Sequence, residues 1–163
     1  MPVYLLSFEA YGHASDEAEA PRFVLRNDWP PRDRVPLAER YRQAIEDHRV
    51  EFDADHRRKL IDLVMDAQPR HAYRCFGVGA GPTRLHAVLA WDDRRDAVTL
   101  RSAIRSAVGR GMNREFGRQP WLGEGGATKR VRNRTQFGYL LDTYLPKQTS
   151  ERWTAGAGLA VPA

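Results

Sequence analysis

The stretch AYRCFGVGAGPTRLHAVLAW, residues 72–91, decides the fold. It holds two apolar runs, residues 72–78 and 83–91, on either side of the turn sequence Gly79-Ala80-Gly81-Pro82. Glycine and proline favour reversals of the chain, and a reversal between two apolar runs indicates a β-hairpin. We therefore predict two adjacent antiparallel strands.

Apolar periodicity on both sides of the hairpin predicts the other elements. They are strands at residues 3–8 and 128–132, and helices at residues 36–47, 53–67, 96–116 and 135–145. This order is typical of the α+β class. We expect a ferredoxin-like fold with a four-stranded antiparallel sheet and helices packed on one face.

The length of 163 residues suits one domain, which we assign to residues 1–148. Residues 11–36 are polar and rich in turn formers, so they are expected to be a surface insertion. The Ala/Gly-rich end predicts a flexible tail at residues 149–163. No apolar run approaches the roughly 20 residues of a membrane span. The only cysteine, Cys75, fits a reducing compartment, so we expect a cytoplasmic protein without a membrane partner.

Positive charge is concentrated in one part of the chain. Residues 84–134 carry 12 Lys/Arg against 5 Asp/Glu, whereas residues 1–83 carry 12 against 14. Such a basic block predicts a polyanion partner, although an arginine-rich composition can also reflect a GC-rich genome. The predicted nucleic-acid contacts are Arg101, Arg105, Arg110, Arg114, Lys129, Arg130 and Arg132.

Four side chains could carry chemistry. Arg84 and His86 share one face of their strand, because strand side chains alternate. Tyr144 and Gln148 are four residues apart and share one face of a helix. If that face covers the strand, an imidazole, an amide and a phenol converge, which suits metal-assisted attack of tyrosine on a phosphodiester. A plainer interpretation makes His86 a hydrogen-bonded structural residue and Tyr144 a packing residue.

Taken together, these segments resemble the single-tyrosine HUH transposases, particularly the relatives of REP-associated tyrosine transposases. The resemblance covers residues 3–148. It rests on SFEAYG at 7–12, TRLHAVL at 83–89, the long basic helix, residues 121–132 and the segment 144–148. It implies that His86 and Gln148 hold one divalent cation, Mg²⁺ or Mn²⁺. It also implies that Tyr144 attacks single-stranded DNA, leaving a 5′-phosphotyrosine and a free 3′-hydroxyl.

Arg84 departs from this pattern, because it stands where the family has the first metal-binding histidine. A guanidinium has no free lone pair and cannot ligate a metal. Arg84 could instead clamp the phosphate and act as a catalytic residue.

Three functions therefore remain open. The first is a transposase-like protein that binds single-stranded or hairpin DNA, with Tyr144 as the nucleophile for cleavage and rejoining, acting as a monomer or a homodimer. The second is a catalytically silent nucleic-acid-binding module of the same fold. The third is a small ferredoxin-like RNA-binding or regulatory protein.

Overall fold

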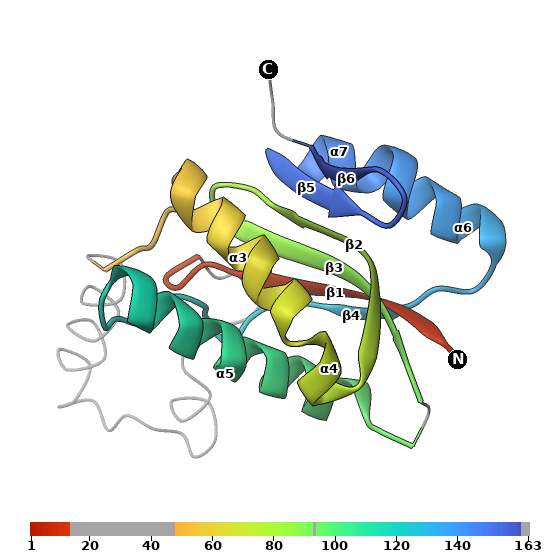
Figure 1. Ribbon diagram of the computed structural model, residues 1–163, viewed down its shortest axis with the longest axis horizontal. Coiled ribbons are helices and arrows are strands. Elements are labelled where there is room, and N and C mark those ends of the chain that lie inside the picture. The colour runs from red at the N-terminus through yellow and green to blue at the C-terminus, as the bar shows by residue number, and fades with distance from the viewer. Residues whose placement is uncertain (14–47, 93, 161–163) are drawn as a thin grey trace, which may run out of the picture.

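The predicted hairpin lies inside the sheet of the protein. The structure is a computed structural model and describes residues 1–13, 48–92 and 94–160. Strand β2 (Tyr73–Ala80) pairs with β3 (Arg84–Trp91) in antiparallel orientation, which confirms the prediction for this stretch (Figure 1).

Six strands form the sheet within the described residues, and every neighbouring pair is antiparallel. The order is β4-β1-β3-β2-β5-β6. The strands added to the hairpin are β1 (Val3–Glu9), β4 (Thr128–Arg130), β5 (Glu151–Thr154) and β6 (Gly158–Ala160). The α+β class with an antiparallel sheet is confirmed, but the sheet has two more strands than the four expected.

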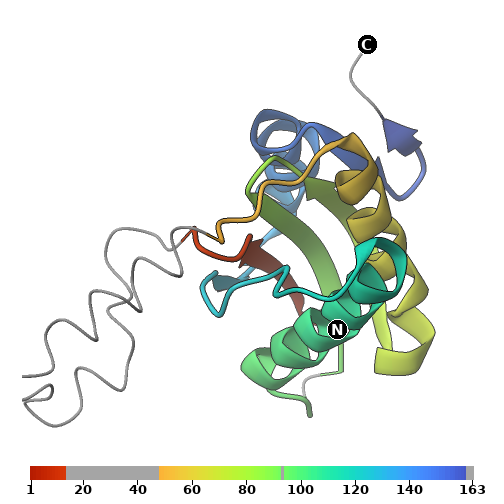
Figure 2. The same cartoon turned by 90° about the vertical axis from the view of Figure 1, so that its left-hand side faces the viewer.

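Two long helices cover one face of the sheet (Figures 1 and 2). Helix α3 (Ala54–Asp66) begins at Asp53, whose carboxylate accepts a hydrogen bond from the backbone N–H of His56. Helix α5 (Ala97–Phe116) begins at Asp96 in the same way, and it runs without a break through its two glycines. Such caps satisfy N–H groups that a helix start leaves open. A short helix, α4 (Gln68–His71), follows α3.

The last helical segment covers the opposite face. It consists of α6 (Arg134–Tyr139), the π-helical turn η2 (Leu140–Tyr144) and α7 (Leu145–Gln148). Its Leu140 and Leu145 pack against Leu5 and Val88 of the sheet. The long helices share one face as expected. The terminal segment covers the other face, and β3 is therefore buried on both sides.

Pro146 explains the irregular turn of this segment. Proline has no N–H, and its ring clashes with the carbonyl of the residue four positions before it in a regular α-helix. The chain widens just before it, and the N–H of Leu145 bonds to the carbonyl of Leu140, five residues back. The terminal helical segment also lies very close to the sheet at Gly77 of β2. A Cβ on Gly77 would lie 2.6 Å from Cδ2 of Leu141.

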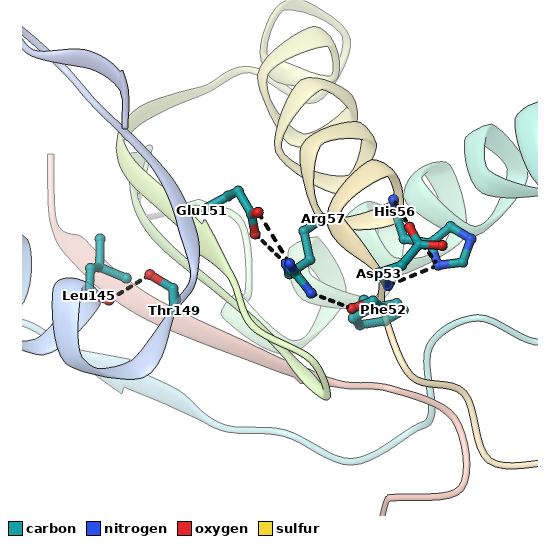
Figure 3. A network of polar contacts seen from close by, with 7 residues as sticks. All are labelled: Phe52, Asp53, His56, Arg57, Leu145, Thr149 and Glu151. Atoms are coloured by element: carbon teal, nitrogen blue, oxygen red, sulfur yellow. Dashed lines mark hydrogen bonds and ion pairs between the residues drawn. The ribbon is translucent and has the colours of Figure 1, made fainter. Parts of the chain in front are cut away.

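The prediction of a flexible tail from residue 149 is wrong for residues 151–160. Strand β5 pairs with the edge of β2, and β6 pairs with β5. Glu151 is buried, and its carboxylate accepts hydrogen bonds from the guanidinium of Arg57, which also donates to the carbonyl of Phe52 at 2.6 Å (Figure 3). A buried ion pair and a paired sheet edge fix this segment although its composition suggests disorder.

Two predicted elements lie wholly or mostly outside the described residues. The helix expected at residues 36–47 lies outside the described residues, and so does the surface insertion at 11–36 apart from residues 11–13. Among the described residues, no helix combines the length and the apolar character that a membrane crossing requires.

Gly111 and Gly109 of α5 provide a test of the packing between the two long helices. A Cβ on Gly111 would lie 2.2 Å from Cδ2 of Leu63 on α3, whereas a Cβ on Gly109 meets no heavy atom within 4 Å. We expect Gly111→Ala to lower the free energy of unfolding by about 1–3 kcal/mol through overpacking. Gly109→Ala should raise it by about 0.5–1 kcal/mol through helix propensity. Denaturant unfolding of both variants measures these changes, and equal effects would contradict the close approach.

The Arg57–Glu151 pair gives a second test. Glu151→Ala removes the carboxylate and leaves a largely buried guanidinium unpaired, with the Arg57 side chain 16% exposed. We expect a loss of about 3 kcal/mol of unfolding free energy. The matched control is Asp92→Ala, which removes a solvent-exposed ion pair with Arg94 and an exposed hydrogen bond from the Arg94 backbone N–H, and should cost about 1 kcal/mol or less. Equal stability of the two variants would show that β5 is not anchored by this pair.

Candidate functional site

A cavity of about 270 Å³ lies on the sheet face that η2 covers, between β1, β3 and the segment before β4. Its lining residues are Leu5, Ser7, Glu9, Arg84, His86, Gly126, Ala127, Lys129 and Tyr144. Three residues predicted for one site, Arg84, His86 and Tyr144, therefore lie together. Lys129, predicted only as a nucleic-acid contact, lines the same cavity.

Strand pairing positions the floor of this cavity. In the register of β1 with β3, Ser7 lies opposite His86 and Glu9 lies opposite Arg84. The intervening residue Leu85 points to the other face and is fully buried against the long helices. The alternation predicted for β3 is therefore present, and it places an arginine and a histidine side by side over a central strand.

His86 is buried and held in a defined orientation. Its side chain is 1% exposed, and Nδ1 lies 2.8 Å from Oγ of Ser7. Nε2 is buried and has no hydrogen-bond partner among the described residues. Burial, together with the smaller effect of the positive charge of Arg84, lowers the pKa of His86 to about 4. The imidazole is therefore neutral near pH 7, and the hydrogen-bonding capacity of Nε2 is unused.

Tyr144 lines the cavity from the terminal helical segment, which lies over the sheet. It is the last residue of the π-helical turn, and its ring lies 5.4 Å from the imidazole of His86 in an edge-to-face arrangement at 77°. π-Helical turns are rare and occur frequently at functional sites.

Gln148 does not join the site. Its side chain is exposed and does not line the cavity. Gln148 ends α7, four residues and about 6 Å along the helix axis beyond Tyr144. Its backbone carbonyl lies near Gly81 in the turn that follows β2. The shared helix face does not bring both side chains to one point, because the helix runs past the cavity.

The donors around the cavity do not fit the expected Mg²⁺ or Mn²⁺ site. These ions prefer several oxygen ligands, yet the cavity offers one carboxylate, Glu9, and one imidazole, His86. Within the part of the chain that the structure describes, no group of three or more His, Cys, Asp or Glu is placed to hold a metal. Two cationic side chains, Arg84 and Lys129, occupy the lining instead.

A glycine loop closes the cavity beside β1, and Arg101 of α5 holds it. The guanidinium donates to the carbonyls of Ser7 at 3.1 Å, Glu124 at 3.5 Å and Gly125. Gly126 has φ +134°, and a Cβ there would lie 2.0 Å from the carbonyl oxygen of Ser7. Arg101 therefore has a structural role that its predicted part in nucleic-acid binding did not include.

The other predicted contacts divide between two surfaces. Arg110 and Arg114 are exposed on α5, on the face opposite Tyr144, and Arg105 donates to the carbonyl of Gly123 at 3.4 Å. Arg130 and Arg132 are exposed at the edge near the cavity. Sequence reasoning missed Ser7 and Glu9, because the pairing of β1 with β3 across 79 residues is not encoded in local periodicity.

The low pKa of His86 gives a pH prediction. The unfolded imidazole, with a pKa near 6.5, binds a proton more readily than the folded one. Stability is therefore fully present above pH 6.5 and falls by up to about 3 kcal/mol as the pH drops towards 4. NMR titration should place the His86 imidazole near pH 4, and Arg84→Gln should raise that value. In His86→Asn the loss of stability over this pH range should shrink, and a His86 signal titrating near 6.5 would contradict the burial.

Comparisons with known proteins give a limited result. No protein-family model matches the chain, and no curated protein matches it. One solved structure that is similar is described as "Structure of the REP associates tyrosine transposase bound to a REP hairpin". The sequence identity is 8% and the TM-score 0.49, over 88% of this chain and 64% of that one. This chain thus spans less than two thirds of the length of that protein. The candidate site is therefore defined by the geometry of its own residues.

Proposed function

We propose that the protein binds single-stranded or hairpin DNA with one backbone phosphate in the cavity, and that Tyr144 is the nucleophile for strand cleavage and rejoining. One observation supports this above others. The phenol of Tyr144 and a neutral imidazole share a small cavity with two cationic side chains, Arg84 and Lys129. A phosphodiester carries the negative charge that such a lining attracts.

The chemistry that follows conserves every atom. The phenolic oxygen of Tyr144 forms a bond to phosphorus while the bond from phosphorus to the 3′-oxygen breaks. The products are a 5′-phosphotyrosine and a strand with a free 3′-hydroxyl, and the phenolic proton is balanced by the proton that the leaving oxygen gains. Rejoining is the reverse attack of a 3′-hydroxyl on the phosphotyrosine.

The charged and polar lining residues have separate roles in this proposal. Arg84 and Lys129 neutralise the phosphate and the charge that develops on it, which is the part that a metal ion plays in related chemistry. His86 offers Nε2 as the hydrogen-bonding atom, because Ser7 already engages Nδ1. Glu9 lies opposite Arg84 in the strand register and keeps the net charge of the lining low enough for the two cations to sit close together.

A second function is favoured by the donor set. A lining without three metal ligands also suits a catalytically silent module that only binds DNA. The two functions share the phosphate site and differ in whether Tyr144 becomes covalently linked. The homodimer and the cytoplasmic location stay predictions.

The test is formation of a covalent adduct. Labelled hairpin and single-stranded DNA are incubated with the protein in EDTA, Mg²⁺ or Mn²⁺, and adducts are separated under denaturing conditions. We expect an adduct that forms in EDTA and is absent in Tyr144→Phe, because only the hydroxyl can form the phosphotyrosine bond. Arg84→Gln and Lys129→Gln should each slow its formation by about 10²–10³-fold.

Binding measurements separate the two functions. Each of the same two substitutions should reduce the slope of log affinity against log salt by about 0.7 for single-stranded DNA. The control is Arg58→Gln, an exposed arginine on α3 across the sheet. Binding that depends on Arg84 and Lys129 without any adduct supports the silent module. An adduct that requires metal would show that the two cations do not replace one, and the absence of DNA binding would refute both functions.

A further inference from the structure

A second, larger hollow lies on the same face of the sheet as the cavity. It has a volume of about 750 Å³, within the roughly 300–1,000 Å³ typical of ligand pockets. Its apolar part is made by Val3, Phe76, Val131 and Phe137, all half-buried. Its polar part includes the exposed residues Arg130, Arg132 and Arg134. We call this hollow the phenylalanine groove.

The phenylalanine groove continues the cavity along β1. Val3 of the groove and Leu5 and Ser7 of the cavity follow one another at alternate positions of β1, so they share one face. Val3 and Ser7 are about 13 Å apart along the strand, given a rise of about 3.3 Å per residue.

The charge of the phenylalanine groove selects the chemistry of its occupant. Among the described residues that line it, three are arginines and none is acidic. Arginine binds phosphates and stacks on flat rings. An apolar floor with two aromatic rings and an arginine rim matches a ligand that is flat and apolar in the middle and anionic at its edge.

We propose that the phenylalanine groove holds an unpaired nucleobase of the DNA strand whose phosphate lies in the cavity. This inference rests on the proposed function and adds the part of the strand next to the reacting phosphate. A base in a duplex stacks on its neighbours, so only an unpaired base can present its face to protein aromatics. The groove thereby selects DNA that is single-stranded on one side of the phosphate in the cavity.

Phe137 is the residue to test. The rings of Phe76 and Phe137 meet edge to face, with centroids 5.2 Å apart at 87°, and Arg74 already lies over the ring of Phe76 at 5.0 Å. Phe137→Leu removes the ring but keeps an apolar side chain on the floor. Arg132→Ser and Arg134→Ser remove charge from the rim. Arg58→Ser, on α3 across the sheet, is the matched control.

The experiment uses the full chain and a DNA hairpin with a short unpaired extension. Three forms of the extension are compared: with its bases, with abasic residues, and base-paired to a complementary strand. Fluorescence anisotropy gives the affinities, and 2-aminopurine in the extension reports stacking by loss of fluorescence. We expect the form with unpaired bases to bind about 5-fold or more tightly than the other two.

In Phe137→Leu that preference and the 2-aminopurine quenching should be lost, while binding of the abasic form stays unchanged. Arg132→Ser and Arg134→Ser should weaken binding of all forms, and Arg58→Ser should weaken none. Equal affinity for unpaired and abasic extensions would overturn the groove proposal and leave the proposed function intact. A preference that survives in Phe137→Leu would place the base elsewhere. A change in the sedimentation of the protein alone on Phe137→Leu would assign the groove to contact between copies of this chain, and the absence of any DNA binding would refute both proposals.

Discussion

The antiparallel register between β1 and β3 is the constraint on which the rest of the structure depends. It places Ser7 opposite His86 and Glu9 opposite Arg84 on one face, and at the same time Phe8 opposite Leu85 on the other. Because strand side chains alternate, a slip of one residue would bury the polar set against the long helices and expose the apolar set. The apolar core that holds Leu85, Phe8 and their neighbours therefore also fixes the atoms of the candidate site.

The terminal helical segment depends on the same sheet in a different way. Gly77 lets Leu141 approach β2 closely, and Leu140 and Leu145 anchor the segment over Leu5 and Val88. Pro146 then forces the widened turn that ends at Tyr144. The position of the phenol is thus determined by a missing side chain on one element and a missing N–H on another. Neither feature contacts the cavity.

Local sequence patterns were sufficient for some elements and insufficient for others. The hairpin, the two capped helices and the face shared by Arg84 and His86 follow from turn residues, N-caps and alternation, which act over a few positions. The strand at Glu151 was missed because its stability comes from Arg57, 94 residues away, and from the free edge of β2. Gln148 was placed in the site because helical spacing gives the direction of a side chain but not where the helix crosses the sheet. The sequence identified Lys129 only as part of a basic block. Its place in the cavity depends on strand pairing with Leu5, which is distant in the sequence.

Gly126 shows how a position without functional atoms can look essential. Its backbone conformation and the nearby carbonyl of Ser7 and guanidinium of Arg101 leave no room for any side chain. In a survey of substitutions scored by function, every replacement at 126 would be harmful, alanine included, and the position would rank with nucleophiles and phosphate ligands. Its intolerance would come from backbone conformation and lack of space, and from no chemical role. A smaller residue in place of Arg101 would not relieve this constraint, because the carbonyl oxygen of Ser7 at 2.0 Å and the φ of +134° would both remain.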